Sequence, residues 1–129
     1  MIPEDVQEEI VKRLRGVEAE HQVKILIAIE SGSRAWGFAS PNSDYDVRFI
    51  YMREPEWYQA VDLEERRDVI EYPIVDEIDL SGWDVRKALR LFSKSNPSFI
   101  EWVQSPITYM DQSLFREAAL ALLPKIYAP

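Results

Sequence analysis

The chain has 129 residues, 47% of them hydrophobic and 29% charged, which suits one compact domain and excludes a wholly disordered or fibrous protein. It has no cysteine and one histidine, which excludes disulfides, zinc–thiolate sites, thiol nucleophiles and histidine-rich metal sites. The formal charge of −8 opposes non-specific binding to nucleic acid, whereas clustered carboxylates suit hard divalent cations such as Mg²⁺.

The first segment predicts a helix followed by a strand. Apolar residues recur every three or four positions over residues 3–20, which indicates an amphipathic helix with Pro3 in its first turn and His21 at its end. The apolar, β-branched stretch VKILIAIE, residues 23–30, predicts a buried strand. This strand ends at a bend formed by residues 31–33.

Neither targeting nor membrane signals are evident in the sequence. The opening MIPEDVQEEI is acidic and polar, unlike a signal peptide. No run approaches the ~20 apolar residues that a membrane-spanning helix needs. We therefore expect a cytoplasmic protein that makes no membrane contact.

A loop and a second strand come next. Glycine, serine, proline and asparagine crowd residues 31–43, which excludes a long regular element but allows one helical turn around residues 34–37. The segment DYDVRFIYM, residues 44–52, alternates between two faces and predicts a strand. Asp44 and Asp46 fall on the same face of this strand, together with Arg48 and Ile50.

The second half of the chain predicts one more β region and three helices. Pro73 splits or borders the β region at residues 69–80, after a short helix that Pro55 opens. The helices are expected to begin at Asp84, Asn96 and Asp111, each of which can act as an N-cap. In the first of them, the residues expected to face the core are Val85, Ala88, Leu89 and Phe92. The order of elements predicts one α/β (α+β) domain over residues 1–129, a small mixed β-sheet flanked by helices.

The chemistry is concentrated in a glycine–serine bend followed by paired aspartates. Gly32 lets the backbone approach a phosphate group, and the N–H and hydroxyl groups that follow it can donate hydrogen bonds to phosphate oxygens. Asp44 and Asp46, at positions i and i+2 of a strand, project from one face roughly 7 Å apart at Cα. That separation suits a pair of metal ions about 3.5–4 Å apart.

A third carboxylate is expected from a neighbouring strand, to help remove the proton of an attacking hydroxyl. Asp79 is the first choice, because the apolar Ile78 and Leu80 on either side of it face the core. Glu77 shares the parity of Asp79 and is the reserve candidate. Asp76 is expected to point the other way.

The Gly32-Ser33 bend followed by Asp44-Tyr45-Asp46 resembles the signature of the DNA-polymerase-β-like nucleotidyltransferases. The longer string ESGSRAWGFASPNSDYDVRFIY, with DLSGWDVRKALRL and NPSFIEWVQSP downstream, closely resembles the nucleotidyltransferases associated with RNA-repair ligases, known as RlaP-like. These motifs span residues 30–106. Members of that family usually continue into a helical C-terminal region.

The resemblance implies a nucleotidyltransferase (polymerase-β palm-like) fold and a role for each motif residue. Gly32, Ser33 and Arg34 would bind the phosphates of the incoming NTP, with the guanidinium neutralising charge as pyrophosphate leaves. Asp44 and Asp46 would hold two Mg²⁺ ions, or Mn²⁺ in their place, and Asp79 would complete the triad. The implied reaction transfers NMP from an NTP to a hydroxyl acceptor.

The same residues also fit other kinds of site in part. An EF-hand beginning at Asn42 is excluded, because valine and arginine stand where its glycine and glutamate are required. A P-loop is excluded by Phe38, which stands where lysine is needed. Ordinary ion pairing is an alternative for Arg34 and the favoured interpretation for Arg48. Trp36 is expected to pack under the loop rather than stack on a base.

The acceptor stays open at this stage. The family resemblance favours RNA ends, whereas the acidic charge fits a protein side chain or a small molecule better. A non-catalytic nucleotide-binding or interaction module, such as an antitoxin-type partner, is the alternative from a different class. The intact Gly-Ser and Asp-x-Asp motifs favour the enzyme.

Overall fold

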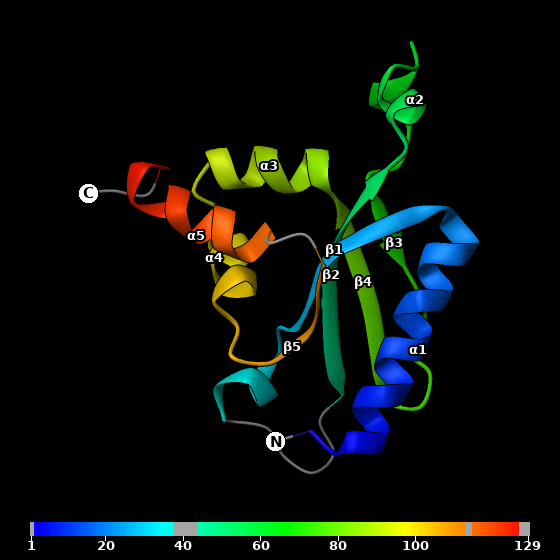
Figure 1. Cartoon of the computed structure of the whole chain (residues 1–129), viewed down its shortest axis with the longest axis vertical. Coiled ribbons are helices and arrows are strands. Elements are labelled where there is room, and N and C mark those ends of the chain that lie inside the picture. Colours follow the sequence, from blue (N-terminus) through cyan, green and yellow to red (C-terminus); the bar gives the residue numbers. More distant parts are fainter. Residues whose placement is uncertain (1, 38–43, 113–114, 127–129) are drawn as a thin grey trace.

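The computed structural model describes residues 2–37, 44–112 and 115–126, and in these ranges it forms a five-stranded mixed sheet with helices on both faces (Figure 1). The strand order across the sheet is β3-β4-β2-β1-β5. In chain order the elements are α1 (Glu4–His21), β1 (Val23–Glu30), the 3₁₀ helix η1 (Ser33–Trp36), β2 (Tyr45–Arg53), α2 (Pro55–Tyr58), the 3₁₀ helix η2 (Leu63–Glu65), β3 (Val69–Glu71), β4 (Ile78–Asp84), α3 (Val85–Ser93), α4 (Pro97–Gln104), β5 (Thr108–Asp111) and α5 (Phe115–Ile126). The predicted α/β architecture is confirmed.

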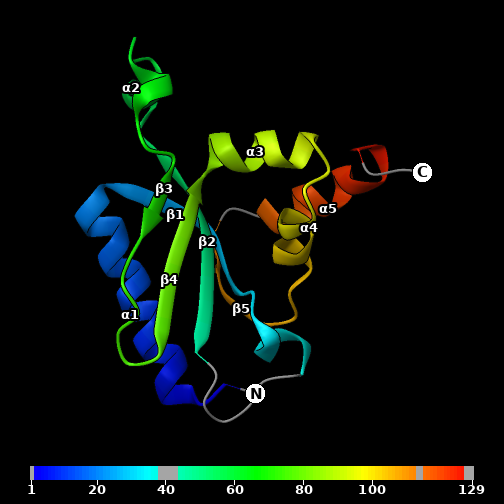
Figure 2. The same cartoon turned by 180° about the vertical axis from the view of Figure 1, so that it is seen from behind.

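One parallel pairing sits among antiparallel ones. β2 runs parallel to β4, whereas β1 pairs antiparallel with both β2 and β5, and β3 pairs antiparallel with β4. The C-terminal end of β1 therefore lies at the same end of the sheet as the start of β2 and of β4. This end carries the glycine–serine bend (Figure 2).

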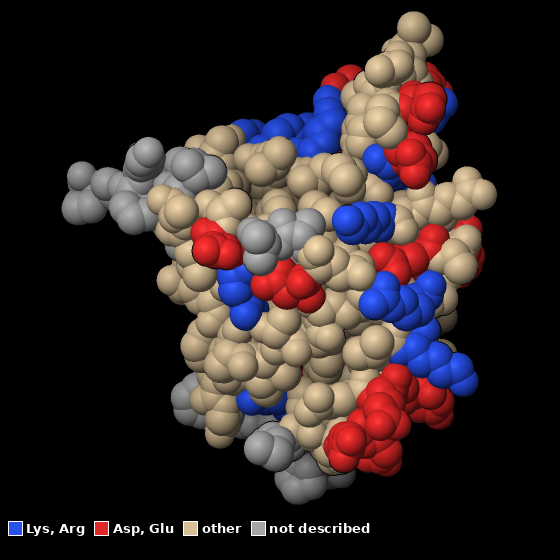
Figure 3. Space-filling view, viewed as in Figure 1, with Lys and Arg blue, Asp and Glu red and all other residues tan. Residues whose placement is uncertain are grey.

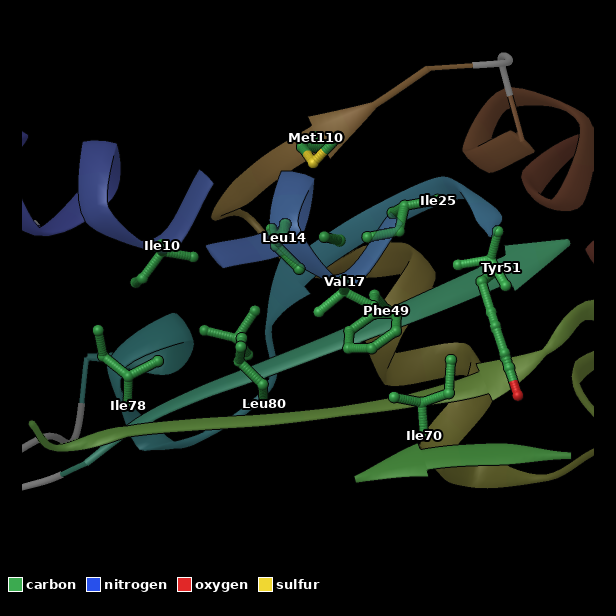
Figure 4. Close-up of a cluster of buried hydrophobic side chains, with 13 residues drawn as sticks. Ile10, Leu14, Val17, Ile25, Phe49, Tyr51, Ile70, Ile78, Leu80 and Met110 are labelled. Atoms are coloured by element: carbon green, nitrogen blue, oxygen red, sulfur yellow. The ribbon is translucent and has the colours of Figure 1, made fainter. Parts of the chain in front are cut away.

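The α1 face of the sheet buries the larger apolar cluster. Ile10, Leu14 and Val17 of α1, all at most 2% exposed, pack on β-strand residues such as Phe49 and Leu80 (Figure 4). Full burial of each such side chain stabilises the fold by about 2 kcal/mol. These three residues lie on the face expected from the sequence period, and Pro3 is the N-cap of α1 rather than part of its first turn.

The opposite face is covered by α3, α4 and α5 (Figure 1). Trp83 of β4 stacks on Trp102 of α4 with ring centroids 3.8 Å apart, as expected for aromatic residues that build the core. Leu89 was expected to face inward but is 52% exposed, because the apolar contact of α3 runs through Ala88 and Phe92.

Helix starts were predicted correctly at two of three positions. The Asp84 side chain accepts a hydrogen bond from the backbone N–H of Arg86, and Asn96 caps α4 in the same way. The predicted cap at Asp111 is wrong, because Asp111 lies in β5 and pairs with Ile27 of β1. The sequence analysis missed this four-residue strand. Within the described ranges, no helix is both long and apolar enough to span a membrane.

Candidate active site

Two carboxylates meet where β2 and β4 begin. Asp46 and Asp79 are Cα partners in the parallel ladder, and neighbouring strands lie about 4.8 Å apart. Ile78 and Leu80 are buried on the α1 side, so the Asp79 side chain projects from the other face, as predicted. The Asp46 side chain shares this face, because Val47 also belongs to the α1-side cluster.

The bend after β1 lies directly on Asp46. The backbone N–H of Ser31 donates a 2.9 Å hydrogen bond to the carbonyl oxygen of Asp46. A Cβ atom added at Gly32 would overlap Asp46 Oδ2 and come within 2.9 Å of Asp46 Cγ. Only glycine leaves room for this approach, so the predicted neighbourhood of bend and acid is confirmed.

Arg34 lies beside the bend in η1, as expected. Its guanidinium stacks over the Tyr45 ring, 4.0 Å from the centroid. Its positive charge also lowers the pKa of Asp46 and of Glu30, although other effects outweigh it at both carboxyls. Trp36, in the same turn, is 46% exposed, and most of the loop under which it was expected to pack lies outside the described residues. The Ser33 side chain and residues 38–43 lie outside the described part.

The acids share one electrostatic field. Burial is the main cause that raises the pKa of Asp46, and the negative charges of Asp79 and Asp44 raise it further. Arg48 opposes this rise most strongly. The negative charges of Asp79 and Asp44 thus act on Asp46 at this end of the sheet, and the positive charges of Arg48 and Arg34 act against them.

Arg48 holds the two strands and the two acids together. One guanidinium nitrogen, Nη2, lies 3.0 Å from Asp79 Oδ2 and 4.0 Å from Asp46 Oδ1. The other, Nη1, donates to the carbonyl oxygens of Asp79 and Val47. The interpretation of Arg48 as an ion-pairing residue is confirmed.

The carboxylates suit a divalent metal by chemistry, but the triad is not assembled as predicted. Asp44 is exposed and precedes β2. Among the described residues, no group of three or more acidic or histidine side chains is disposed to hold a metal ion. The carboxylate oxygens of Asp44, Asp46 and Asp79 fit Mg²⁺ or Mn²⁺ as hard ligands. In this arrangement, however, Asp79 is bound to Arg48.

Comparison with known proteins shows the family of the chain. The model of a family described as the RNA repair pathway DNA polymerase beta family matches residues 6–129. The chain belongs to that family. It is also 48% identical over 124 residues to an uncharacterised protein of Bacillus subtilis (strain 168), YcgL. That match covers 96% of the chain but 47% of YcgL, so the chain spans about half the length of this relative. No solved structure matches the chain significantly.

Glu30 supports the bend and the start of β2, a role that was not predicted from the sequence. Glu30 is fully buried at the end of β1, which raises its pKa. Its Oε2 accepts a 2.9 Å hydrogen bond from the backbone N–H of Asp46, and its Oε1 accepts a 2.7 Å bond from the Tyr109 hydroxyl. A charged residue that closes an apolar strand directly before the bend was the available signal.

The candidate third carboxylates lie in and just after the turn before β4. Asp76 pairs with Arg13 of α1 at 2.9 Å, so it points away from the site as predicted. Glu77 lies in the turn with a φ of 65°, where its carbonyl oxygen accepts from the backbone N–H of Tyr45. Asp79, in the strand beside Asp46, is the better placed of the two candidates in this family member.

Proposed function

We propose that this chain carries the catalytic core of a metal-dependent nucleotidyltransferase. It transfers NMP from an NTP to a hydroxyl acceptor and releases pyrophosphate. One observation carries the proposal: the Gly32 bend lies against Asp46, and Asp46 lies beside Asp79 in the parallel ladder. Three separate segments thus bring a phosphate-accessible backbone and two carboxylates to one end of the sheet.

Each residue has a defined task in this proposal. The Gly32-Ser33 bend binds the triphosphate through backbone N–H groups, and Arg34 neutralises charge on the leaving pyrophosphate. Asp44, Asp46 and Asp79 would hold two Mg²⁺ or Mn²⁺ ions, which would supply Lewis-acid stabilisation of phosphate charge. A carboxylate oxygen of Asp79 accepts the proton of the acceptor hydroxyl.

An RNA end is the proposed acceptor, because the description of the matching family names an RNA repair pathway. The acidic surface makes this binding weak. Acidic side chains gather over the first half of α1, and basic ones gather over α3 (Figure 3). Arg86, Lys87 and Arg90 on α3 pair with Glu64 and Asp68, so much of their charge is already neutralised. A protein side chain or a small molecule is the alternative acceptor.

A non-catalytic nucleotide-binding module is the second candidate function. The observation in its favour is the ion pair between Arg48 and Asp79, because a carboxylate bound to arginine is less available to a metal. Such a module binds NTP but leaves it intact. The two functions therefore differ in product formation rather than in binding.

Transfer of label from each α-³²P NTP tests the proposal. The chain is incubated with Mg²⁺ or Mn²⁺ and with RNA, protein or small-molecule acceptors. Asp46→Asn and Asp79→Asn serve as site variants, and Asp76→Asn is the matched control on the α1 side. We expect label in the acceptor with wild type and with Asp76→Asn only. Equal label in all four proteins, or NTP binding without transfer, would reject the enzyme.

A further inference from the structure

Arg48 is held at the site by contacts that do not depend on a carboxylate. Its Nη1 donates to the carbonyl oxygen of Asp79 at 3.0 Å and to that of Val47 at 3.1 Å. Its side chain is only 21% exposed, so the guanidinium is largely removed from water. The positive charge would therefore stay beside the acids even when its bond to the Asp79 carboxylate opens.

The same guanidinium occupies an oxygen that a metal would need. Nη2 donates to Asp79 Oδ2 at 3.0 Å and lies 4.0 Å from Asp46 Oδ1. The hydrogen bond occupies a lone pair of Asp79 Oδ2 that would otherwise coordinate a cation. A guanidinium close to a bound metal also adds repulsion between like charges. Arginine and metal thus oppose each other at this oxygen.

We propose that Arg48 is a built-in counter-ion that keeps the acidic cluster closed until a divalent cation takes Asp79 Oδ2 from it. The inference rests on the proposed function, because it needs a metal at Asp46 and Asp79. Before metal binds, one positive charge offsets the repulsion between two adjacent carboxylates.

Removal of Arg48 should change metal affinity differently for the proposed role and for two alternative roles. If Arg48 orients Asp79 for the metal, its removal weakens metal binding. If it only ties β2 to β4, its removal lowers stability and leaves metal affinity unchanged. If it is a counter-ion that the metal displaces, its removal strengthens metal binding, because two linked sites affect each other reciprocally.

Mn²⁺ affinity, measured by electron paramagnetic resonance and by calorimetry, separates these roles. Arg48→Met keeps the length of the side chain without charge, and Arg48→Lys keeps the charge without the planar fork. Arg13→Met is the matched control. Arg13 is also 21% exposed and also binds a backbone carbonyl and a carboxylate, namely Val75 and Asp76, on the other side of the sheet.

We expect Arg48→Met to bind Mn²⁺ about tenfold more tightly than wild type, Arg48→Lys to fall between them, and Arg13→Met to match wild type. Mn²⁺ should also raise the Tm of Arg48→Met more than that of wild type. Weaker or unchanged Mn²⁺ binding in Arg48→Met, or no Mn²⁺ binding by any of the proteins, would overturn the inference. If Arg48→Met fails to fold, Arg48→Lys decides. Lysine keeps the charge but cannot form the planar fork, so this variant should still bind Mn²⁺ more tightly than wild type.

The label-transfer assay distinguishes failure of the counter-ion inference from failure of the proposed enzymatic function. Tighter Mn²⁺ binding in Arg48→Met without label transfer by wild type supports the counter-ion and rejects the enzyme. Label transfer by wild type with unchanged Mn²⁺ affinity in Arg48→Met supports the enzyme and rejects the counter-ion.

Discussion

Gly32 and Asp46 are in direct contact across the end of the sheet, so close that a methyl group at position 32 would overlap the Asp46 carboxylate. The contact joins the segment after β1 to the first acid of β2. It explains why a residue without a side chain is required at this bend, since the Asp46 carboxylate occupies the space that a Cβ atom would take.

Gly32→Ala should therefore abolish label transfer and lower the free energy of unfolding by about 1–3 kcal/mol, because the added methyl displaces Asp46. Gly16→Ala is the matched control. Gly16 lies in α1 with nothing within 4 Å of an added Cβ, so the substitution should stabilise the helix by about 0.5–1 kcal/mol. Urea unfolding measures both changes. Normal activity in Gly32→Ala would contradict the contact.

Asp46→Asn should separate stability from activity. The pKa of Asp46 is raised mainly by burial and further by Asp79 and Asp44, so its charge is unfavourable in the folded protein. We expect the variant to be at least as stable as wild type at pH 7. Loss of a metal ligand worth several kcal/mol should lower label transfer by at least about a hundredfold. A clearly destabilised Asp46→Asn with normal activity would argue against the assigned role.

Glu30 should make stability fall as pH rises. Burial raises its pKa above the usual 4.5, so the folded protein holds this proton where the unfolded chain has lost it. Between pH 4.5 and the raised folded-state pKa, the free energy of unfolding therefore decreases with increasing pH. The curve for Glu30→Gln lacks this contribution, so the stability of wild type relative to the variant should fall across that window.

Glu9→Gln provides the control of opposite sign for that measurement. The hydrogen bond from Arg13 is the first cause that lowers the pKa of Glu9 below 4.5. Its contribution to stability is present above pH 4.5 and is lost as pH falls through the lowered value. Chemical denaturation at a series of pH values records both variants. Parallel curves for wild type and Glu30→Gln would contradict the buried carboxylate.

Tyr109→Phe should destabilise the protein by about 1–3 kcal/mol, because it leaves the buried Glu30 carboxylate without one of its donors. The loss should be smaller in the Glu30→Gln background, since the two residues act as one unit. Tyr72→Phe removes a hydroxyl that donates to the exposed Glu20, and it should cost less. Thermal and urea unfolding of the four variants test this coupling, and additive losses would contradict it.

Local patterns in the sequence determined much of the fold. The three-to-four-residue period of α1 and the alternation of β2 predicted which side chains are buried, because these patterns depend only on the geometry of one element. The caps Asp84 and Asn96 were also predictable, since each satisfies backbone groups a few residues away. The positions of Gly32 and Asp46 followed from the order of strand, bend and strand.

Only the tertiary structure decided how these pieces meet. The pairing that sets Asp79 beside Asp46 joins residues far apart in the chain, and no local pattern specifies the partner or the register of a parallel strand. The strand β5 also depends on tertiary structure, because it forms by pairing with the edge of β1. The hydrogen bond from Tyr109 to Glu30 follows from this pairing. The sequence by itself determined which residue types stand at the bend and along each strand, because residue type and local period are written in it. The contact of Arg48 with Asp79 was decided by strand register, a property of the assembled sheet.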